Sequence, residues 1–380
     1  MTQPQPSLGS PPDYERARNR RQKQRAAGLH PDHWYPVLWD RELKVGEVRE
    51  VTFWRRSIAV YRGRDGKIRA LENRCAHRQL KLSKGNVEDC RLTCSYHGWS
   101  YDETGRCVGI SHSLFGHAMP NVRVQSYPVR VQYGIVFVFP GDPALAVSRD
   151  LPEIPEWSSE SGWAKIGIDF TWRAHHSIII DNTCDFTHAY LHRYRRPFTR
   201  AELLHLETVG DEVVLEYDTQ VGQGRFSRLL VNRKRTNMNS MRLGYRYPYQ
   251  WSSTDEKIKH WCFVLPIDEH TTRAFFLFYF HPDIVQLPWV PWRALRRWVL
   301  SAFMPLAKRL IVRPLLDEDG VAVEAEQEGY EAHFERPVPD LNPVVQAFQA
   351  LTIRKWEEHL ASQGRGAREG TGEPQVATPV

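Results

Sequence analysis

Two cysteines and two histidines share one short segment of this 380-residue chain. Cys75-x-His77 is followed, after sixteen intervening residues, by Cys94-x-x-His97. Each half of the segment therefore offers one thiol and one imidazole. Two equivalent loops of this kind suit a two-iron cluster in which one iron takes both thiolates and the other takes both imidazoles. The segment predicts a [2Fe–2S] cluster that carries electrons.

Two other structures compete for the same four residues. A zinc site could use them, but zinc fingers usually supply a cysteine pair and then a histidine pair. A disulfide would leave both histidines without a role. We expect no signal peptide, because the first thirty residues are polar and basic, so the six cysteines are expected to be reduced or metal-bound. Cys90 lies inside the segment without a partner at ligand spacing and is interpreted as structural.

A second group of possible metal ligands lies in "NTCDFTHAYLHR". On a helix, Asp185, His188 and His192 would share one face. The two histidines could then bind the same metal ion, and Asp185 could hydrogen-bond a ligand imidazole. Taken alone, such a pair is better explained by two histidines that merely cap or pack the helix.

The acidic run in "LLDEDGVAVEAEQ" could complete this site. Two histidines and one carboxylate form the facial triad of non-haem Fe(II) oxygenases, which leaves positions open for O2 and substrate. The alternative is a solvated helix start at Asp317, Glu318 and Asp319. The apolar residues that follow, Val321 and Val323, favour an inward-facing helix.

The elements that must position these residues fall into two parts. Short alternating segments fill 33–140, and "HWCFVLPIDEHTTRAFFLFYF" predicts two paired antiparallel strands. Helical patterns surround Asp185 and recur at 292–310 and 342–359. The fold class is therefore α+β, with a small all-β domain before a larger domain of sheet and helices. We divide the chain into a flexible basic arm (1–30), the all-β cluster domain (31–142), a linker (143–160), the catalytic domain (161–362) and a disordered tail (363–380).

The order of these motifs resembles the α subunit of Rieske non-haem iron oxygenases, over about residues 31–362. The resemblance implies a helix-grip catalytic domain and a bridging, catalytic role for Asp185 between the two metal centres. Two departures are visible. Three residues separate His188 from His192, as in the carbazole-dioxygenase-like branch, where most members have four, and Gln79 stands where many members have Gly. The resemblance rests on C-x-H-R with C-x-x-H-G-W, on N-x-x-D-x-x-H, and on Glu318, Asp319, Glu324 and Gln327, and it implies Cys75, His77, Cys94 and His97 as cluster ligands and His188, His192 and Asp319 as iron ligands.

The same resemblance implies the activity and the partners. The protein would be a homotrimeric terminal oxygenase that receives electrons from a separate reductase through a ferredoxin. It would use O2 to hydroxylate, dealkylate or desaturate an apolar substrate, such as a polycyclic or isoprenoid compound. The alternative is a Rieske electron-transfer protein with a non-catalytic second domain.

Charge and hydropathy bear on the remaining partners. The net charge of +6 comes largely from 16–25 and has no nucleic-acid-reading motif beside it, so no nucleic-acid partner is expected. Residues 292–313 form a basic amphipathic pattern that could pack on the catalytic sheet or lie on an anionic membrane surface. We expect a cytoplasmic protein that is membrane-associated under the second alternative.

Overall fold

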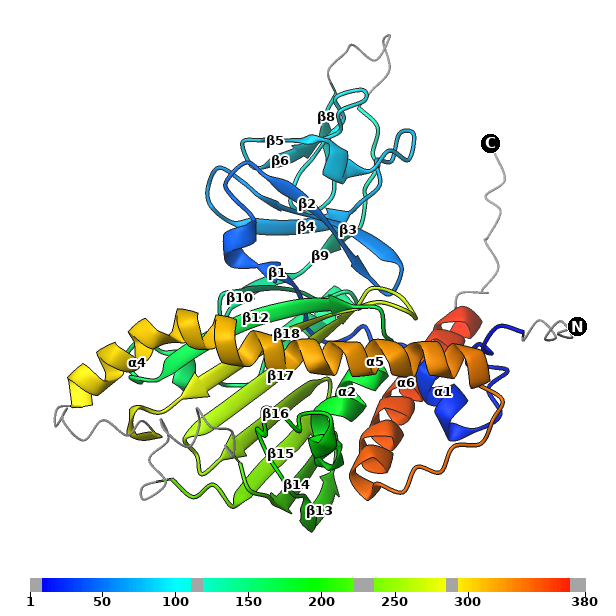
Figure 1. Cartoon of the computed structure of the whole chain (residues 1–380). Coiled ribbons are helices and arrows are strands. Elements are labelled where there is room, and N and C mark those ends of the chain that lie inside the picture. Colours follow the sequence, from blue (N-terminus) through cyan, green and yellow to red (C-terminus); the bar gives the residue numbers. More distant parts are fainter. Residues whose placement is uncertain (1–8, 111–118, 222–235, 285–292, 370–380) are drawn as a thin grey trace, which may run out of the picture.

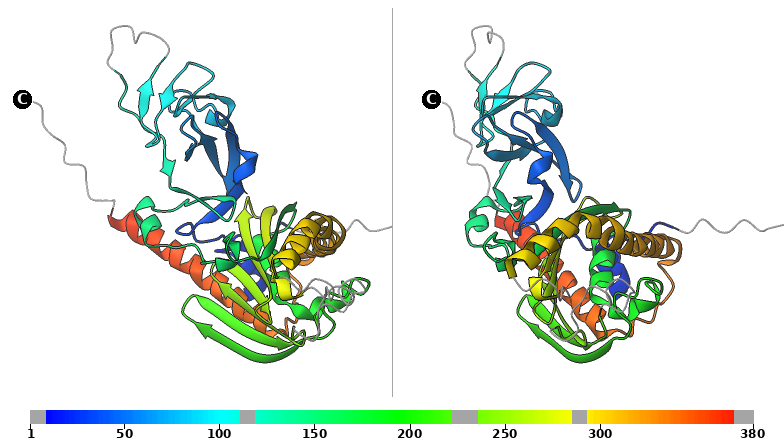
Figure 2. Two further views of the ribbon diagram at one scale, coloured as in Figure 1. Left: turned by 90° about the vertical axis from the view of Figure 1, so that its left-hand side faces the viewer. Right: turned by 60° about the vertical axis from the view of Figure 1, so that its left-hand side comes forward.

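The computed structural model describes residues 9–110, 119–221, 236–284 and 293–369. The cluster domain stands on one side of the larger catalytic domain (Figure 1), and two further views show the same separation (Figure 2). The two-part α+β architecture expected from the sequence is therefore confirmed.

Three small antiparallel sheets build the cluster domain and its base. The turn of one hairpin, between β2 and β3, is made by Trp54 and Arg55, both with positive φ (45° and 64°), as the tight two-residue turns of hairpins require. The sheets are β2-β3-β4-β9 (Val48–Phe53, Arg56–Arg62, Ile68–Glu72, Ser126–Tyr127), β5-β6-β7-β8 (Asn86–Glu88, Arg91–Thr93, Ser100–Tyr101, Cys107–Gly109) and β1-β11-β10 (Tyr35–Trp39, Ile135–Val138, Val129–Gln132).

A seven-stranded antiparallel sheet forms the floor of the catalytic domain. The strand pair expected near 260–280 is the β17–β18 hairpin, in which Cys262 pairs with Phe276. Side chains alternate along these strands, so Phe276 faces the helices while Phe275 packs on Trp39 of β1. The order is β12-β18-β17-β16-β15-β14-β13 (Ala164–Trp172, Thr272–Phe280, Ile258–Pro266, Tyr249–Thr254, Ser240–Arg246, Glu212–Asp218, Glu202–Val209).

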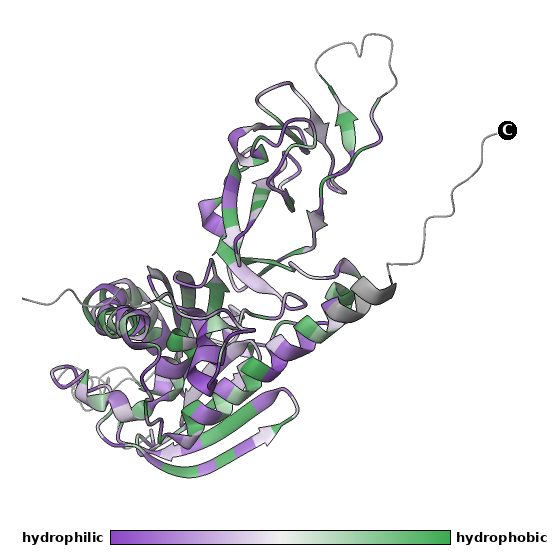
Figure 3. Cartoon of the chain, turned by 90° about the vertical axis from the view of Figure 1, so that its right-hand side faces the viewer, coloured by the Kyte–Doolittle hydropathy of each residue, from purple (hydrophilic) through white to green (hydrophobic). Residues whose placement is uncertain are grey.

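Helices cover one face of this sheet (Figure 1). A short π-helical turn, η7 (Lys308–Val312), joins α4 to α5 three residues after Pro305. Apolar and polar residues alternate along α6 (Figure 3), as its two faces require. This helix continues to Glu369, so the expected tail at 363–380 is wrong for its first residues. The helices are α2 (His176–Cys184), α4 (Arg293–Ala307), α5 (Arg313–His333) and α6 (Pro343–Glu369).

Residues 9–30 differ from the expected flexible arm, because they contain a packed helix, α1 (Arg20–Ala26). Gln24 and Arg25 on this helix are buried. The Arg25 guanidinium lies 3.0 Å from the Asp181 carboxylate on α2 and 2.7 Å from Glu326 on α5. The basic composition suggested a solvated arm, but the ion pairs with Asp181 and Glu326 hold this part against the catalytic domain.

Arg25→Met is expected to destabilise the protein by about 3 kcal/mol, because it leaves the buried Asp181 carboxylate without its cation. The free energy of unfolding in urea measures the effect. Arg18→Met, at an exposed position just before the same helix, is the control and should change it by less than about 0.5 kcal/mol. An equal loss in both variants would contradict a specific role for the buried ion pair.

Candidate metal centres

The first candidate centre is formed by two loops at the end of the cluster domain. One loop follows β4 and carries Cys75 and His77, and the other joins β6 to β7 and carries Cys94 and His97. The imidazole rings of His77 and His97 lie 4.7 Å apart, centroid to centroid. The fold therefore brings the two halves of the Cys75–His97 segment together.

The backbone of the two loops is alike. Gln79 N donates to Cys75 O, and Gly98 N donates to Cys94 O. Gln79 and Gly98 have φ of 63° and 65°, in the left-handed region that favours glycine. Gln79, which stands where many members of the family have Gly, thus keeps the same turn. Its side chain accepts a hydrogen bond from Arg74.

Burial separates the thiols from the imidazoles. Cys75 and Cys94 are buried, whereas His77 is exposed at the tip. Burial raises the pKa of the Cys94 thiol, as does its closeness to Cys75. Tyr101 Oη lies 3.2 Å from Cys75 Sγ. Two buried thiols beside two more exposed imidazoles fit a [2Fe–2S] cluster with mixed thiolate and imidazole ligands.

The spacing of the second candidate centre suggested a continuous α-helix, but the structure shows an interrupted one. α2 ends at Cys184, and Asp185 accepts a hydrogen bond from Thr187 N, which starts the short 3₁₀ helix η5 (Phe186–Tyr190). His188 lies inside η5, and His192 follows it in a turn. The Asp185 cap breaks the α-helix, yet the two histidines still face the same point.

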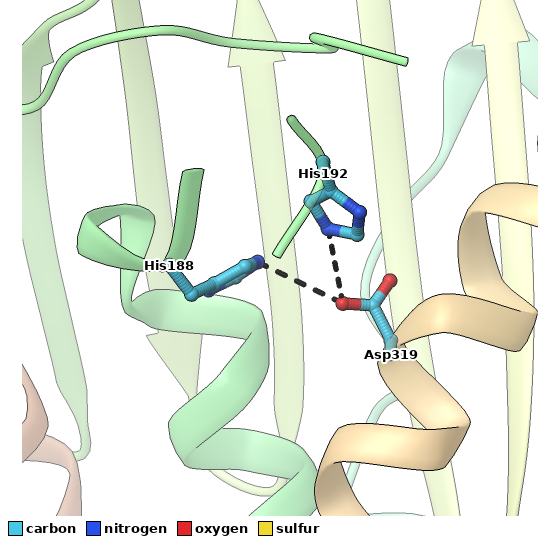
Figure 4. Close-up of side chains that lie close together, drawn as sticks. All are labelled: His188, His192 and Asp319. Atoms are coloured by element: carbon cyan, nitrogen blue, oxygen red, sulfur yellow. Dashed lines mark ion pairs between the residues drawn. The ribbon is translucent and has the colours of Figure 1, made fainter. Parts of the chain in front are cut away.

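That point is completed by Asp319 on α5 (Figure 4). Asp319 Oδ1 lies 3.2 Å from His192 Nε2 and 3.7 Å from His188 Nε2. One possible ligand atom of each residue lies within 4.8 Å of the others, as a single bound metal ion requires. Gly320 lets α5 pack closely on β12, because a Cβ there would lie 2.4 Å from Trp172 Nε1. Asp317, the other carboxylate considered, is exposed.

Neighbouring polar groups orient these side chains. Glu318 Oε2 lies 2.8 Å from His192 Nδ1, which leaves Nε2 directed at Asp319. Asn182 Nδ2 lies 3.4 Å from Asp319 Oδ1. Burial lowers the pKa of His192, but hydrogen bonds to Asp319 and Glu318 outweigh it and raise the pKa overall. For His188, burial prevails and the pKa is lowered. The orienting roles of Glu318 and Asn182 were missed in the sequence.

Asp185 lies beside this site rather than in it. Its Oδ1 accepts hydrogen bonds from Thr187 N and from Asn342 Nδ2, both at distances below 3.0 Å. Within the described chain no hydrogen bond joins its carboxylate to His188, whose buried Nδ1 has no partner. Asp185 and His188 both border a polar surface cleft of about 740 Å³ between α1, α2 and the 336–340 segment.

On the opposite side the site faces aromatic rings. The Phe198 ring lies 5.3 Å from His188 and 5.8 Å from His192, and it packs on Phe186. The helix-facing side of the sheet carries a polar pair, Ser252 Oγ and His260 Nδ1, 2.7 Å apart. Burial lowers the pKa of His260 to about 4, so this imidazole is neutral at physiological pH. The surroundings suit an apolar molecule with a polar group.

These features together define a class of protein: an oxygenase that activates O2 at a mononuclear iron and receives electrons through an iron–sulfur cluster. Two family models match the chain, the Rieske [2Fe-2S] domain over residues 33–128 and the vanillate O-demethylase oxygenase C-terminal domain over residues 172–363. The chain belongs to the Rieske non-haem iron oxygenases, as a terminal oxygenase subunit, and its cofactors are a [2Fe–2S] cluster and a non-haem iron.

Individual proteins agree with this assignment. A 4beta-methylsterol monooxygenase of Methylococcus capsulatus is 40% identical over 357 residues, which cover 93% of this chain and 96% of that protein. The structure of dicamba monooxygenase bound to 3,6 dichlorosalicylic acid covers 88% of this chain and 100% of its own, with a TM-score of 0.67 and 21% identity. The terminal oxygenase of carbazole 1,9a-dioxygenase from Nocardioides aromaticivorans covers 89% and 97%, with a TM-score of 0.66 and 21% identity. These two structures share the fold.

Proposed function

We propose that the protein is a monooxygenase of methylated sterols or similarly apolar polycyclic lipids. In the net reaction a substrate C–H bond becomes C–OH, the second oxygen atom of O2 leaves as water, and two electrons and two protons are consumed. The observation that carries the proposal is the convergence of His188, His192 and Asp319 beside aromatic rings, in a chain 40% identical to a methylsterol monooxygenase.

Each centre has its own set of residues in this proposal. Cys75 and Cys94 would hold one iron of the cluster, and His77 and His97 would hold the other. His188, His192 and Asp319 would hold the mononuclear iron. When bound, the cluster supplies single electrons, and the iron activates O2 next to the substrate. The chain's own contribution is to fix His192 through Glu318 and to border the site with Phe186 and Phe198, which exclude water from the reacting carbon.

The substrate class is supported by the face of the sheet below the site. Rings of Phe276 and Phe278 lie beside His260, 6.2 and 5.3 Å from it. A neutral imidazole paired with Ser252 can bind a hydroxyl group, which sterols carry at one end of an apolar ring system.

Electron supply would come from outside the chain, from a separate reductase through a ferredoxin. We also propose a homotrimer in which the cluster loops of one subunit enter the polar cleft beside Asp185 of the next. In the chain itself these loops and η5 belong to different domains that lie apart (Figure 1). Arg20, Arg336 and Asp340 line the cleft with Asp185, so its charged walls suit a protein surface better than a lipid. Such head-to-tail contacts can close into a ring.

The proposal places the protein in the cytoplasm, with peripheral membrane contact through 292–313. Among the described residues, none of the helices has the length and hydropathy to cross a membrane. The alternative of an electron carrier with an inactive second domain is disfavoured, because such a carrier would not need the converging carboxylate and imidazoles at His188, His192 and Asp319.

The function is tested by supplying the purified holoenzyme with a 4-methylsterol, isotopically labelled O2 and a promiscuous bacterial reductase and ferredoxin. We expect a product that carries one labelled oxygen atom on the methylated ring, detected by mass spectrometry. His97→Ala should lose the spectrum of the reduced cluster and all turnover. Oxidation of small aromatic acids, with no sterol product, would overturn the substrate class.

A further inference from the structure

The outward face of α4 and η7 carries an apolar stripe that nothing in the described chain covers. Trp298 is 68% exposed, Leu306 48% and Leu310 56%. These residues recur at helical spacing and therefore lie along one side. The opposite side of the same helix is buried, with Leu300, Met304 and Ala307 against the catalytic domain. Packing on the sheet thus uses one apolar face of α4 and leaves a second one exposed.

Basic residues border this stripe. Residues 293–316 contain six arginine or lysine residues and no acidic residue. Three of the cations are engaged by the fold. Arg296 lies 3.7 Å from Asp283, Lys308 Nζ donates to Gly167 O at 2.6 Å, and Arg297 Nη2 donates to Ser159 O at 3.0 Å. Arg297 and Arg309 lie exposed next to the apolar side chains. The face therefore combines a large apolar side chain, Trp298, with basic residues of the same helix.

We propose that this face, residues 295–313 of α4 and η7, docks the enzyme on the surface of an anionic phospholipid bilayer. Apolar side chains with a tryptophan and flanking cations are the composition of helices that lie in the membrane interface. This inference rests on the proposed function, because docking would bring the enzyme to a lipid substrate dissolved in the same bilayer.

The charge decides between a lipid surface and a second copy of the chain. A symmetric dimer through this face would bring two uniformly basic stripes together, and like charges across an interface are unfavourable. An anionic bilayer instead neutralises the arginines and covers the apolar residues at the same time. α4 lies at one edge of the molecule, away from the cluster strands β5–β8 (Figure 1), so docking leaves the cluster domain accessible.

The test is co-sedimentation of the holoenzyme with vesicles of phosphatidylcholine, with or without phosphatidylserine. We expect binding only to the vesicles with phosphatidylserine, weakened by added salt. Each basic residue contributes about fivefold at such a surface, so Arg297→Glu/Arg309→Glu should weaken binding by at least about 25-fold. Trp298→Ser should also weaken it. Controls are Arg64→Glu and Val147→Ser, which change an exposed cation and an exposed apolar residue on other elements.

Absent binding of the wild type, or equal binding of wild type and both α4 variants, would overturn the proposal. So would self-association that Trp298→Ser abolishes, because the face would then be covered by a second copy. Vesicle binding is measured without turnover. It can therefore fail while sterol oxidation holds, and sterol oxidation can fail while binding holds.

Discussion

Asp319→Ala is expected to remove the mononuclear iron and all turnover, while the spectrum of the [2Fe–2S] cluster remains. Asp319 supplies the one carboxylate of the converging group, and its Oδ1 lies within 3.7 Å of both imidazole nitrogens. Two imidazoles alone form a weak site for Fe(II), which prefers two histidines with a carboxylate. Iron analysis should fall from about three to about two atoms per chain, because the cluster ligands lie in a separate domain.

Two neighbours of Asp319 provide graded controls. Asp317 is exposed and does not belong to the converging group, so Asp317→Ala should keep its iron and its activity. Glu318 hydrogen-bonds the outer nitrogen of His192, and Glu318→Ala should lower iron affinity or activity by about 10–100-fold. Loss of iron in Asp317→Ala with retention in Asp319→Ala would show that the assignment of the acidic run is wrong.

The spacing in the sequence predicted that His188 and His192 lie together. They do, but the local structure that brings them together differs from the expected helix. A regular helix would place His188 and His192 on one face, and the structure places them at one point through a 3₁₀ turn and a following loop. Asp185 was expected to hydrogen-bond a ligand imidazole, whereas in the described chain its carboxylate caps the start of η5 by accepting from Thr187 N. Cap preferences of aspartate could have indicated this break, yet the period of the histidines suggested an unbroken helix.

The contacts that sequence reasoning missed join residues far apart in the sequence. Glu318 reaches His192, 126 positions earlier, and Arg25 reaches Asp181, 156 positions later. Neither pairing leaves a periodic pattern, because the partners meet only after the sheet and helices have assembled. For the same reason a basic, polar stretch at residues 16–25 resembled a solvated arm. Composition records how polar a segment is, whereas burial depends on partners that come from elsewhere in the chain.

Asp185→Asn is expected to keep the fold and both metal centres and to slow electron transfer from the cluster to the iron by about 10–100-fold. The substitution preserves the size of the side chain and the acceptor for Thr187 N, but it removes the negative charge. The carboxylate borders the polar cleft together with His188, whose Nδ1 has no partner in the described chain. In the proposed trimer a cluster imidazole of the neighbouring subunit would approach this carboxylate, so Asp185 would link the two centres.

The measurement is a single turnover that starts from the chemically reduced cluster, in which cluster oxidation and product formation are followed together. Asp340→Asn is the matched control, because it removes a charge from the same cleft at a residue that does not adjoin His188. A slow step in Asp185→Asn alone indicates a link between the centres, whereas equal slowing in both variants indicates weaker docking of subunits. Wild-type rates in Asp185→Asn, or full activity in a strictly monomeric enzyme, would contradict the proposed link, because electrons would then reach the iron without passing this carboxylate.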